Sequence, residues 1–235
     1  MSERILIFGG EAIPAHIGYT PHIIRAPRKM TVTPIQGSNN EVVDMQDAWE
    51  CYDQPYSLFV SDGTDDCVQP MLDDVARVLS KKGWQTLVDD YEPEIFRLAY
   101  YKGGFNAENR HTRLGKFDIT FRCRPERFLN SGARAINVST GDVLTNPTSY
   151  EAFPLIHITG EGSGTLTVGG KTMSFTGITD YLNIDCDKQD VYRLPSENKN
   201  SLASGEFPVL NSGNNTVTFT GGIATVTITP KYYVI

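Results

Sequence analysis

The second half of this chain alternates apolar and polar residues almost without interruption, and no other feature limits its fold as strongly. From Asn130 onward the alternating stretches are FPLIHITG, GTLTVGG, YLNIDC, NTVTFTGG and IATVTITP, separated by Gly, Asn, Asp and Ser. A period of two places successive side chains on opposite faces of a strand. Short strands at this spacing predict an antiparallel sandwich, with Ala224, Val226 and Ile228 facing a core and the intervening threonines facing water.

The first half contains one segment with helical periodicity, PMLDDVARVLSKKG, which predicts a helix over about residues 70–82 lying across a sheet. Its apolar positions are Met71, Leu72, Val75, Val78 and Leu79. The expected end signals are Pro70 in the first turn, Asp73 and Asp74 near the N-terminus, Lys81 and Lys82 near the C-terminus, and Gly83 as a left-handed stop.

A strand follows at KFDITFRCR, where Phe117, Ile119, Phe121 and Cys123 point to one side. This pattern makes Cys123 a core residue. Charge and tryptophan also divide the chain: residues 1–128 hold 15 basic and 19 acidic residues and both tryptophans, whereas residues 129–235 hold 6 and 9. We therefore predict an all-β protein with one helix and two domains, residues 1–129 and 130–235.

The net charge of −7 argues against a general nucleic-acid binder, because an acidic chain repels phosphate backbones. No apolar run approaches the length of a membrane span, and the first residues lack the order of a signal peptide, so we expect a cytosol-like compartment. The cysteines are widely spaced and are expected to be reduced, mostly buried thiols: Cys51, Cys67, Cys123 and Cys186.

Candidate binding motifs have simpler structural interpretations. GEGSG at 160–164 is glycine-rich like a phosphate loop, but a strand rather than a helix follows, which favours a hairpin turn. Asp185, Asp187 and Asp190 lack the glycine and distal glutamate of a calcium loop, which favours a solvated turn with Leu182, Ile184 and Cys186 facing inward.

Catalytic patterns are absent from the sequence. There is no G-x-S-x-G motif, and His157, His16 and His22 are isolated, with His157 on the polar side of its strand or satisfied within the sandwich. Some neighbouring carboxylates lie in segments whose composition is typical of turns. We expect them to face solvent and aid solubility rather than take part in catalysis: Asp65 with Asp66, Asp89 with Asp90, and Glu92 with Glu94. We therefore predict no catalytic, cofactor-binding or metal site.

Three segments are candidates for protein contacts. A basic stretch favours binding to a protein over binding to nucleic acid, although Arg122 and Arg124 also fit the solvent-exposed face of a strand. Residues 102–115, KGGFNAENRHTRLG, fit no core strand and suggest an extended hairpin or an arm that reaches a neighbour. An aromatic cluster is open to two interpretations, core or subunit contact. The basic residues are Arg110, His111, Arg113, Arg122, Arg124 and Arg127, and the aromatic ones are Trp49, Tyr52, Tyr56 and Phe59.

The arrangement as a whole resembles the distal tail protein (Dit) family of long-tailed, non-contractile phages. The first half ends in F-x-C-x-P at Phe121, Cys123 and Pro125, and MTVTPIQGSNNEVVD resembles the family's strand and glycine turn, with Ser38 where a basic residue is frequent. NPTSYEAFPLIHITGEGSGTLTVGG and YLNIDCDKQDVYR resemble the first sandwich strands. The closing pattern matches at Phe207, Pro208, Leu210, Gly213, Asn215, Val217, Pro230 and Lys231.

The resemblance spans about 80% of the chain in pattern, and every shared motif is a folding motif. It implies a non-enzymatic, homohexameric ring at the phage tail tip, with N-terminal domains continuing the tail tube and galectin-like C-terminal domains projecting outward. The implied partners are the tail tube protein, a tail-associated fibre or lysin protein, and receptor-binding proteins, with DNA passing through an acidic channel. It implies a place in the virion after assembly in the host cytoplasm.

The alternative is a carbohydrate-binding module at the phage tip that contacts the host cell wall. Galectin-type recognition uses a tryptophan against the sugar, and the second half has none, so that machinery is expected to be missing. A tyrosine platform at Tyr181 or Tyr192 is the remaining possibility.

Overall fold

The computed structural model describes residues 5–61, 68–111 and 114–235, with the backbone alone at 108–111. The chain divides into two compact units, residues 1–127 with Ile235, and residues 128–234. Both consist mainly of antiparallel strands, and the described residues contain one α-helix, so the predicted all-β class with one helix is confirmed. None of the helical segments described is long and apolar enough to cross a membrane.

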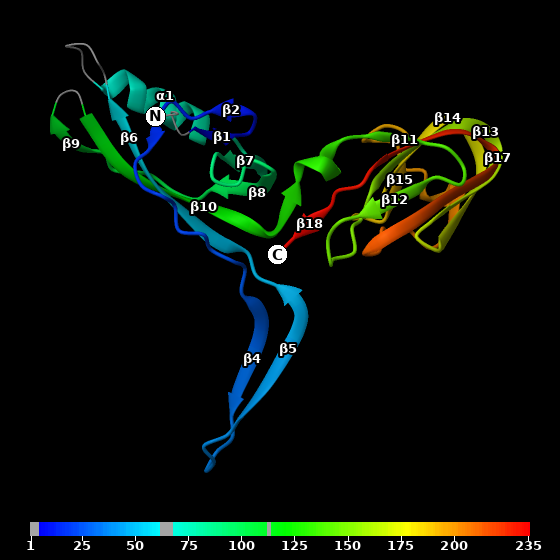
Figure 1. The fold of residues 1–235 in the computed structure, drawn as a ribbon, viewed down its shortest axis with the longest axis horizontal. Helices are drawn as coiled ribbons and strands as arrows, with labels where there is room; N and C mark the ends of the chain where they lie inside the picture. The colour runs from blue at the N-terminus through cyan, green and yellow to red at the C-terminus, as the bar shows by residue number, and fades with distance from the viewer. Residues whose placement is uncertain (1–4, 62–67, 112–113) are drawn as a thin grey trace. The chain divides into compact units, whose positions relative to one another are not determined.

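The first part of the chain forms a nine-stranded sheet, one helix and a separate two-stranded sheet (Figure 1). In the large sheet the order is β2-β1-β7-β8-β10-β6-β3, with β9 and the C-terminal strand β18 (Tyr233–Val234) also pairing with β10. The elements are β1 (Leu6–Phe8), β2 (Glu11–Ala12), β3 (His16–Ile17), β4 (Arg28–Pro34), β5 (Glu41–Trp49), β6 (Tyr52–Ser61), α1 (Gln69–Leu79), β7 (Gln85–Asp89), β8 (Ile95–Tyr101), β9 (Glu108–His111) and β10 (Leu114–Leu129).

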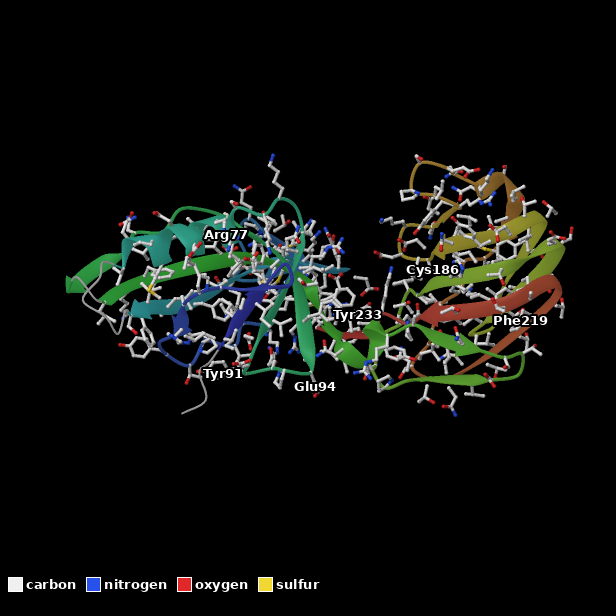
Figure 2. All side chains as sticks on the ribbon, turned by 90° about the horizontal axis from the view of Figure 1, so that it is seen from above. Arg77, Tyr91, Glu94, Cys186, Phe219 and Tyr233 are labelled. Carbon is white, nitrogen blue, oxygen red and sulfur yellow. The ribbon has the colours of Figure 1, made fainter. Side chains whose placement is uncertain are left out.

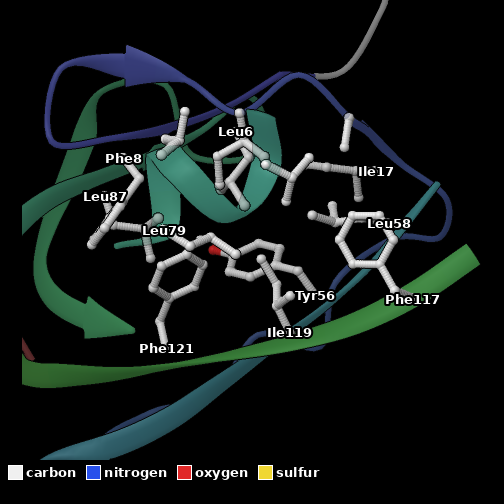
Figure 3. Close-up of a cluster of buried hydrophobic side chains, with 14 of the residues drawn as sticks. Leu6, Phe8, Ile17, Tyr56, Leu58, Leu79, Leu87, Phe117, Ile119 and Phe121 are labelled. Carbon is white, nitrogen blue, oxygen red and sulfur yellow. The ribbon is translucent and has the colours of Figure 1, made fainter. Parts of the chain in front are cut away.

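A hydrophobic core lies between α1 and the large sheet, as Figure 3 shows. The helix contributes Leu72, Val75, Val78 and Leu79, all buried. Strand β10 contributes Phe117, Ile119, Phe121 and Cys123, which are at most 2% exposed, so the predicted inward face of this strand and the core position of Cys123 are confirmed. Because one face of the sheet and one stripe of the helix are apolar, packing them together buries both.

The helix ends at Leu79, three residues before the predicted end. Lys81 lies beyond the helix, and its ammonium group donates to the carbonyls of Phe8 and Gly9 at 3.2 and 3.1 Å. Gly83 does adopt a left-handed φ of +74°, but it serves the turn into β7 rather than the helix end. No acidic residue lies in the first helical turn; Asp74 instead pairs with Arg77, which lies on α1 in Figure 2.

The second unit is built from one seven-stranded sheet that closes around its own core. The order is β11-β17-β13-β14-β15, with β12 on β17 and β16 on β14. The elements are η1 (Asn130–Ala133), β11 (Ile136–Val138), β12 (Val143–Asn146), β13 (Leu155–Val168), β14 (Lys171–Asp185), β15 (Asp190–Tyr192), η2 (Asn200–Leu202), β16 (Ala203–Gly205), β17 (Gly213–Thr229) and β18 (Tyr233–Val234).

Three long strands, β13, β14 and β17, bend in their middles, and both halves of each strand supply the same core. The predicted hairpin turn at 160–164 is wrong: this glycine-rich segment lies inside β13, at bulges where it pairs with both β14 and β17. A Cβ on Gly222 would lie 1.7 Å from the carbonyl oxygen of Glu161, so only glycine permits this close approach.

The bulge also changes which residues of β17 face the core. Thr159 pairs with Thr225 but the next residue, Gly160, pairs with Ile223, so Ala224 is an extra residue in the ladder. Ile223 is therefore buried and Ala224 exposed, opposite to the prediction for Ala224, while Val226 and Ile228 are buried as predicted. A bulge shifts the two-residue period by one position, which regular alternation cannot reveal.

The shared sequence motifs of the second unit hold turns in place. Asn215 is 1% exposed, and its side chain accepts from the Asn211 amide at 2.8 Å and donates to the carbonyls of Asn211 and Gly213 at 2.8 and 2.9 Å. This asparagine therefore satisfies the backbone of the turn that enters β17. The closing motif is a folding motif, as its residue types indicate.

Candidate assembly interface

A two-stranded arm, β4 and β5 with their connecting turn at residues 35–40, extends away from the large sheet of the first unit (Figure 1). Its strands pair only with each other, and every residue of β4 and most of β5 are exposed. Gly37, at φ +80°, forms the tip turn, which the Ser38 amide closes by donating to the Ile35 carbonyl at 3.1 Å.

The base of the arm is fastened by Arg28. Its Nε donates to the Gln46 carbonyl at 3.1 Å, its guanidinium pairs with Asp47 across the strands, and its Cζ lies 5.8 Å from the centre of the Trp49 ring. Trp49 in turn packs against the core of the first unit. The arm is therefore anchored at its root and unsupported along its length.

One face of the arm is mainly apolar, and its charged residue is Glu41, opposite Pro34 near the tip. Met30 is opposite Met45 and Val32 is opposite Val43, and side chains directly opposite on antiparallel strands share a face. These four residues are between 44% and 63% exposed. Six of the exposed large hydrophobic residues lie on the arm or its tip turn: Met30, Val32, Ile35, Val42, Val43 and Met45.

The other face of the arm is mainly polar. Thr31 is opposite Asp44, and Thr33 is opposite Val42. The arm is thus an amphipathic ribbon whose apolar face meets no other described part of the chain and whose two edges carry unpaired backbone groups. Such a ribbon is marginally stable alone in water and readily pairs with another chain.

Residues 102–115 form part of a hairpin, the first of the two alternatives predicted for them. Strand β9 pairs back onto β10, and the ring centre of Phe105 lies 4.7 Å from that of Phe117 beside the core. Residues 112–113 lie outside the described part of the chain. The sequence signal for the arm is the alternation of MTVTP and EVVDM on either side of Gly37, which predicts two strands and a glycine turn but does not say what covers their faces.

The basic stretch does not form a single surface. Arg127 is 6% exposed and its Nη1 donates to Glu92 at 2.9 Å, while Arg122 pairs with Asp53 at 3.0 Å. Arg124 lies 5.6 Å from the centre of the Trp84 ring. Arg113 lies outside the described residues, and only the backbone is described at Arg110 and His111.

The aromatic cluster separates into two environments along β6. Tyr52 and Tyr56 are buried, whereas Phe59 faces outward beside His16, with ring centres 5.3 Å apart. The Tyr56 hydroxyl donates to Asp89 at 2.7 Å, and burial together with the charge of Asp89 raises the pKa of Tyr56 well above its ordinary value. The cluster is therefore partly core and partly surface.

Two of the carboxylates predicted to be solubilising are instead part of a buried ion network. Asp89 is 3% exposed and accepts from Arg97 Nη1 at 3.1 Å, and Glu92 binds the same guanidinium. Asp89 also accepts from the backbone amide of Tyr91 at 3.0 Å, so its charge is compensated from several directions. Asp65 and Asp66 lie outside the described residues.

The other candidate residues have structural partners. Asp185 accepts from Lys231 Nζ at 3.2 Å, Gln54 Nε2 donates to the His22 carbonyl at 2.7 Å, and His157 Nδ1 lies 2.9 Å from Asn183 Oδ1. In the described part of the chain, no group of three potential ligands is placed to hold a metal ion.

Comparisons with known proteins bear on the fold. Residues 58–123, from β6 into β10, match the family model of the phage tail protein RIFT-related domain. The structure is similar to the Dit protein of phage SPP1, described as a hub of the adsorption apparatus in phages that infect Gram-positive bacteria, with a TM-score of 0.71, 12% identity, and 96% of this chain and 98% of that chain covered.

The fold is also similar to chains of the phage p2 baseplate in its activated conformation. The match to the calcium form has a TM-score of 0.54 and that to the strontium form 0.53, each with 10% identity and covering 96% of this chain and 97% of the other. No curated protein matches the chain by sequence. The resemblance to phage distal tail proteins predicted from the sequence is confirmed by the family model and the shared fold.

Proposed function

We propose that this protein is the structural hub of a phage tail tip: a homohexameric ring that joins the tail tube to the tail-associated fibre or lysin protein and to the host-adsorption apparatus. The observation that carries the proposal is the exposed apolar face of the arm. Its occupant is a second copy of the chain, because a two-edged ribbon can continue its sheet with an identical ribbon and a closed ring leaves no edge unpaired. The hub folds described above support the role.

In the ring, the apolar face of each arm is covered by neighbouring copies and the polar face lines a central channel for DNA. Thr31, Thr33 and Asp44 supply hydroxyl groups and a negative charge on that face. A negative wall repels phosphates, so DNA passes without binding. The role is structural rather than catalytic, and the second unit is the galectin-like outer domain, with receptor-binding proteins as further partners.

The mass of the purified chain in solution tests this proposal. Six copies of the 26.1 kDa chain give about 157 kDa by light scattering, with ring closure fixing the number. Val43→Asp, on the apolar face, is expected to reduce the mass to that of one chain, because a buried unpaired carboxylate opposes the contact. The matched control is Val42→Asp, its neighbour on the polar face, which should leave the hexamer intact.

Equal effects of the two substitutions would contradict an interface formed by the apolar face. A wild-type chain that remains monomeric at all concentrations, and also when mixed with its tail tube protein, would overturn the ring itself. Electron microscopy of the wild-type particle should show a central hole, and a solid particle of the same mass would exclude the channel.

A further inference from the structure

Two rows of polar side chains cross the outward face of the second unit's sheet. In each row neighbouring residues are directly opposite on adjacent strands. The residues between them in sequence, among them Ile156, Ile158 and Val226, are buried in the core, so the rows face solvent. The first row is Asn137, Thr227, His157 and Asn183, and the second is Thr225, Thr159 and Tyr181.

Hydrogen bonds hold the side chains of the first row in fixed orientations. The Thr227 hydroxyl donates to Asn137 Oδ1 at 2.7 Å, and Asn183 Nδ2 donates to the Arg193 carbonyl at 3.0 Å. Asn183 therefore presents Oδ1 to the imidazole, and His157 Nδ1 must carry the proton of their 2.9 Å bond. In the tautomer with its proton on Nδ1, Nε2 is an acceptor.

The second row contains an aromatic ring, and an ion pair lies beside it. Tyr181 is half-buried, with its ring centre 5.4 Å from that of His157 and 5.3 Å from the Arg193 guanidinium carbon. Arg193 Nη2 donates to Asp180 Oδ2 at 3.0 Å, so the charges on this face cancel. Thr159 and Thr225 share a hydroxyl–hydroxyl bond of 2.6 Å.

A cavity of about 390 Å³ adjoins the rows at the bulge of β17. Its lining includes Asn137 of the first row and Thr225 of the second, together with Thr140 and Phe219. The polar rows therefore continue into a concave site large enough for one sugar ring or more, because ligand pockets begin at a few hundred cubic ångströms.

We propose that this face binds a neutral saccharide. Sugar hydroxyls both donate and accept hydrogen bonds, and the face offers an imidazole acceptor, amide and hydroxyl groups, and a guanidinium donor. The Arg193 guanidinium lies over the Tyr181 ring, and the part of this half-buried ring that stays exposed provides an apolar surface for the C–H side of a sugar ring. The second unit lacks tryptophan, so Tyr181 is the ring that stacks.

A protein partner fits this face less well than a saccharide. The centre of a protein interface is depleted in polar residues and contains large apolar or aromatic anchors, whereas the centre here is His157 and Thr159. A polyanion is also disfavoured, because Asp180 neutralises Arg193. Side chains already held by hydrogen bonds lose little freedom on binding, which suits the many weak contacts of a sugar.

The test is a glycan array probed with the full-length chain, followed by calorimetric titration of the best neutral saccharide. Tyr181→Thr removes the stacking ring and Thr159→Val removes one hydroxyl; each is expected to weaken binding about tenfold or more. Thr165→Val is the matched control, because Thr165 lies on the same strand and makes the same 2.6 Å bond, to Thr220, at the opposite end of the sheet. It should bind as the wild type does.

The proposal is overturned if no neutral saccharide binds the wild-type chain, or if Thr159→Val and Thr165→Val change its affinity equally. Capture of another tail protein that is lost in Tyr181→Thr, with a silent array, would instead assign the face to a protein. Light scattering separates this proposal from the hub, because Tyr181→Thr should leave the hexamer mass unchanged. Near-ultraviolet circular dichroism confirms that each variant is folded.

Discussion

The arm and the β13–β14 hairpin are built alike and differ in what covers them. Each is a long antiparallel pair with apolar residues at alternate positions. In β13–β14, Leu166 is opposite Met173, and the two are 0% and 1% exposed. In the arm, Met30 is opposite Met45, and the two are 56% and 63% exposed.

The two hairpins differ in exposure because they differ in the strands that flank them and in the glycines at which a strand bends. Strand β13 is paired along both edges, by β14 and β17, and its bend at Gly160–Gly164 brings both of its halves onto one core. Strands β4 and β5 have only each other, and the register shift between them lies at the root of the arm, between Arg28 and Met30. An alternating pattern therefore specifies a face that must be covered, and the chain itself covers it only where the topology allows.

The largest expected effect is on the bend. Gly222→Ala would place a Cβ 1.7 Å from the Glu161 carbonyl oxygen, so the second unit should lose at least about 3 kcal/mol of stability, because backbone must shift. Both tryptophans are in the first half, so tryptophan fluorescence follows the first unit and far-ultraviolet circular dichroism follows both. In urea, the circular dichroism transition should move and the fluorescence transition should not.

Gly170→Ala is the control for this prediction. Gly170 has a φ of +83° but nothing within 4 Å of the added Cβ, so only backbone strain of about 1 kcal/mol is expected. Equal losses in the two variants would mean that the close strand approach at the bend does not hold the sheet over its core.

The second prediction compares the same residue type in the two hairpins. Met173→Ala should lower the free energy of unfolding by about 3 kcal/mol, because it leaves a cavity in a packed core. Met45→Ala should change the free energy of unfolding of the monomer by less than about 0.5 kcal/mol, because its side chain is already in water. Chemical denaturation of both variants in the monomeric Val43→Asp background checks this. A costly Met45→Ala in the monomer would show that the chain covers its own arm.

The fold could be predicted from the sequence wherever local pattern and environment agree. The inward face of β10, the helix and the sandwich strands follow from periodicity and apolar content. The bend could not, because GEGSG is equally suited to a turn and to a bulge, and only the partner strands select between them. The exposure of Ala224 follows from the same bulge.

The arm, our candidate assembly interface, was less predictable than the fold. The alternation at Met30–Pro34 and Glu41–Met45 predicts strands with an apolar face but cannot say whether that face is inside the monomer. The buried carboxylates were equally hard to predict. In the sequence Asp89 has the features of an exposed turn residue, and only the fold shows that Arg97, on the next strand, lies beside it. Long-range partners decide both cases, and no local pattern records them.

The smallest expected effect is a difference in thiol reactivity between the two cysteines that follow the compared hairpins. Cys51 comes two residues after β5 and is half-buried, whereas Cys186 directly follows β14 and is 2% exposed. Burial raises the pKa of the Cys186 thiol to about 12, so its reactive thiolate is scarce at pH 8. Iodoacetamide should therefore modify Cys51 in the folded chain and reach Cys186 only after urea is added, as peptide mass spectrometry can show.

The raised pKa of Cys186 also determines how the stability of the folded state changes with pH. The folded state disfavours the Cys186 thiolate, so stability is complete below the ordinary thiol pKa of 9.0 and is lost as the pH rises toward about 12. The loss for this one group is about 1.4 kcal/mol per pH unit within that window. Cys186→Ala should flatten this slope, whereas Cys51→Ala should leave it unchanged. Equal alkylation of both thiols in the folded chain would show that the second unit's core is as open to solvent as the arm, which would remove the contrast between the two hairpins.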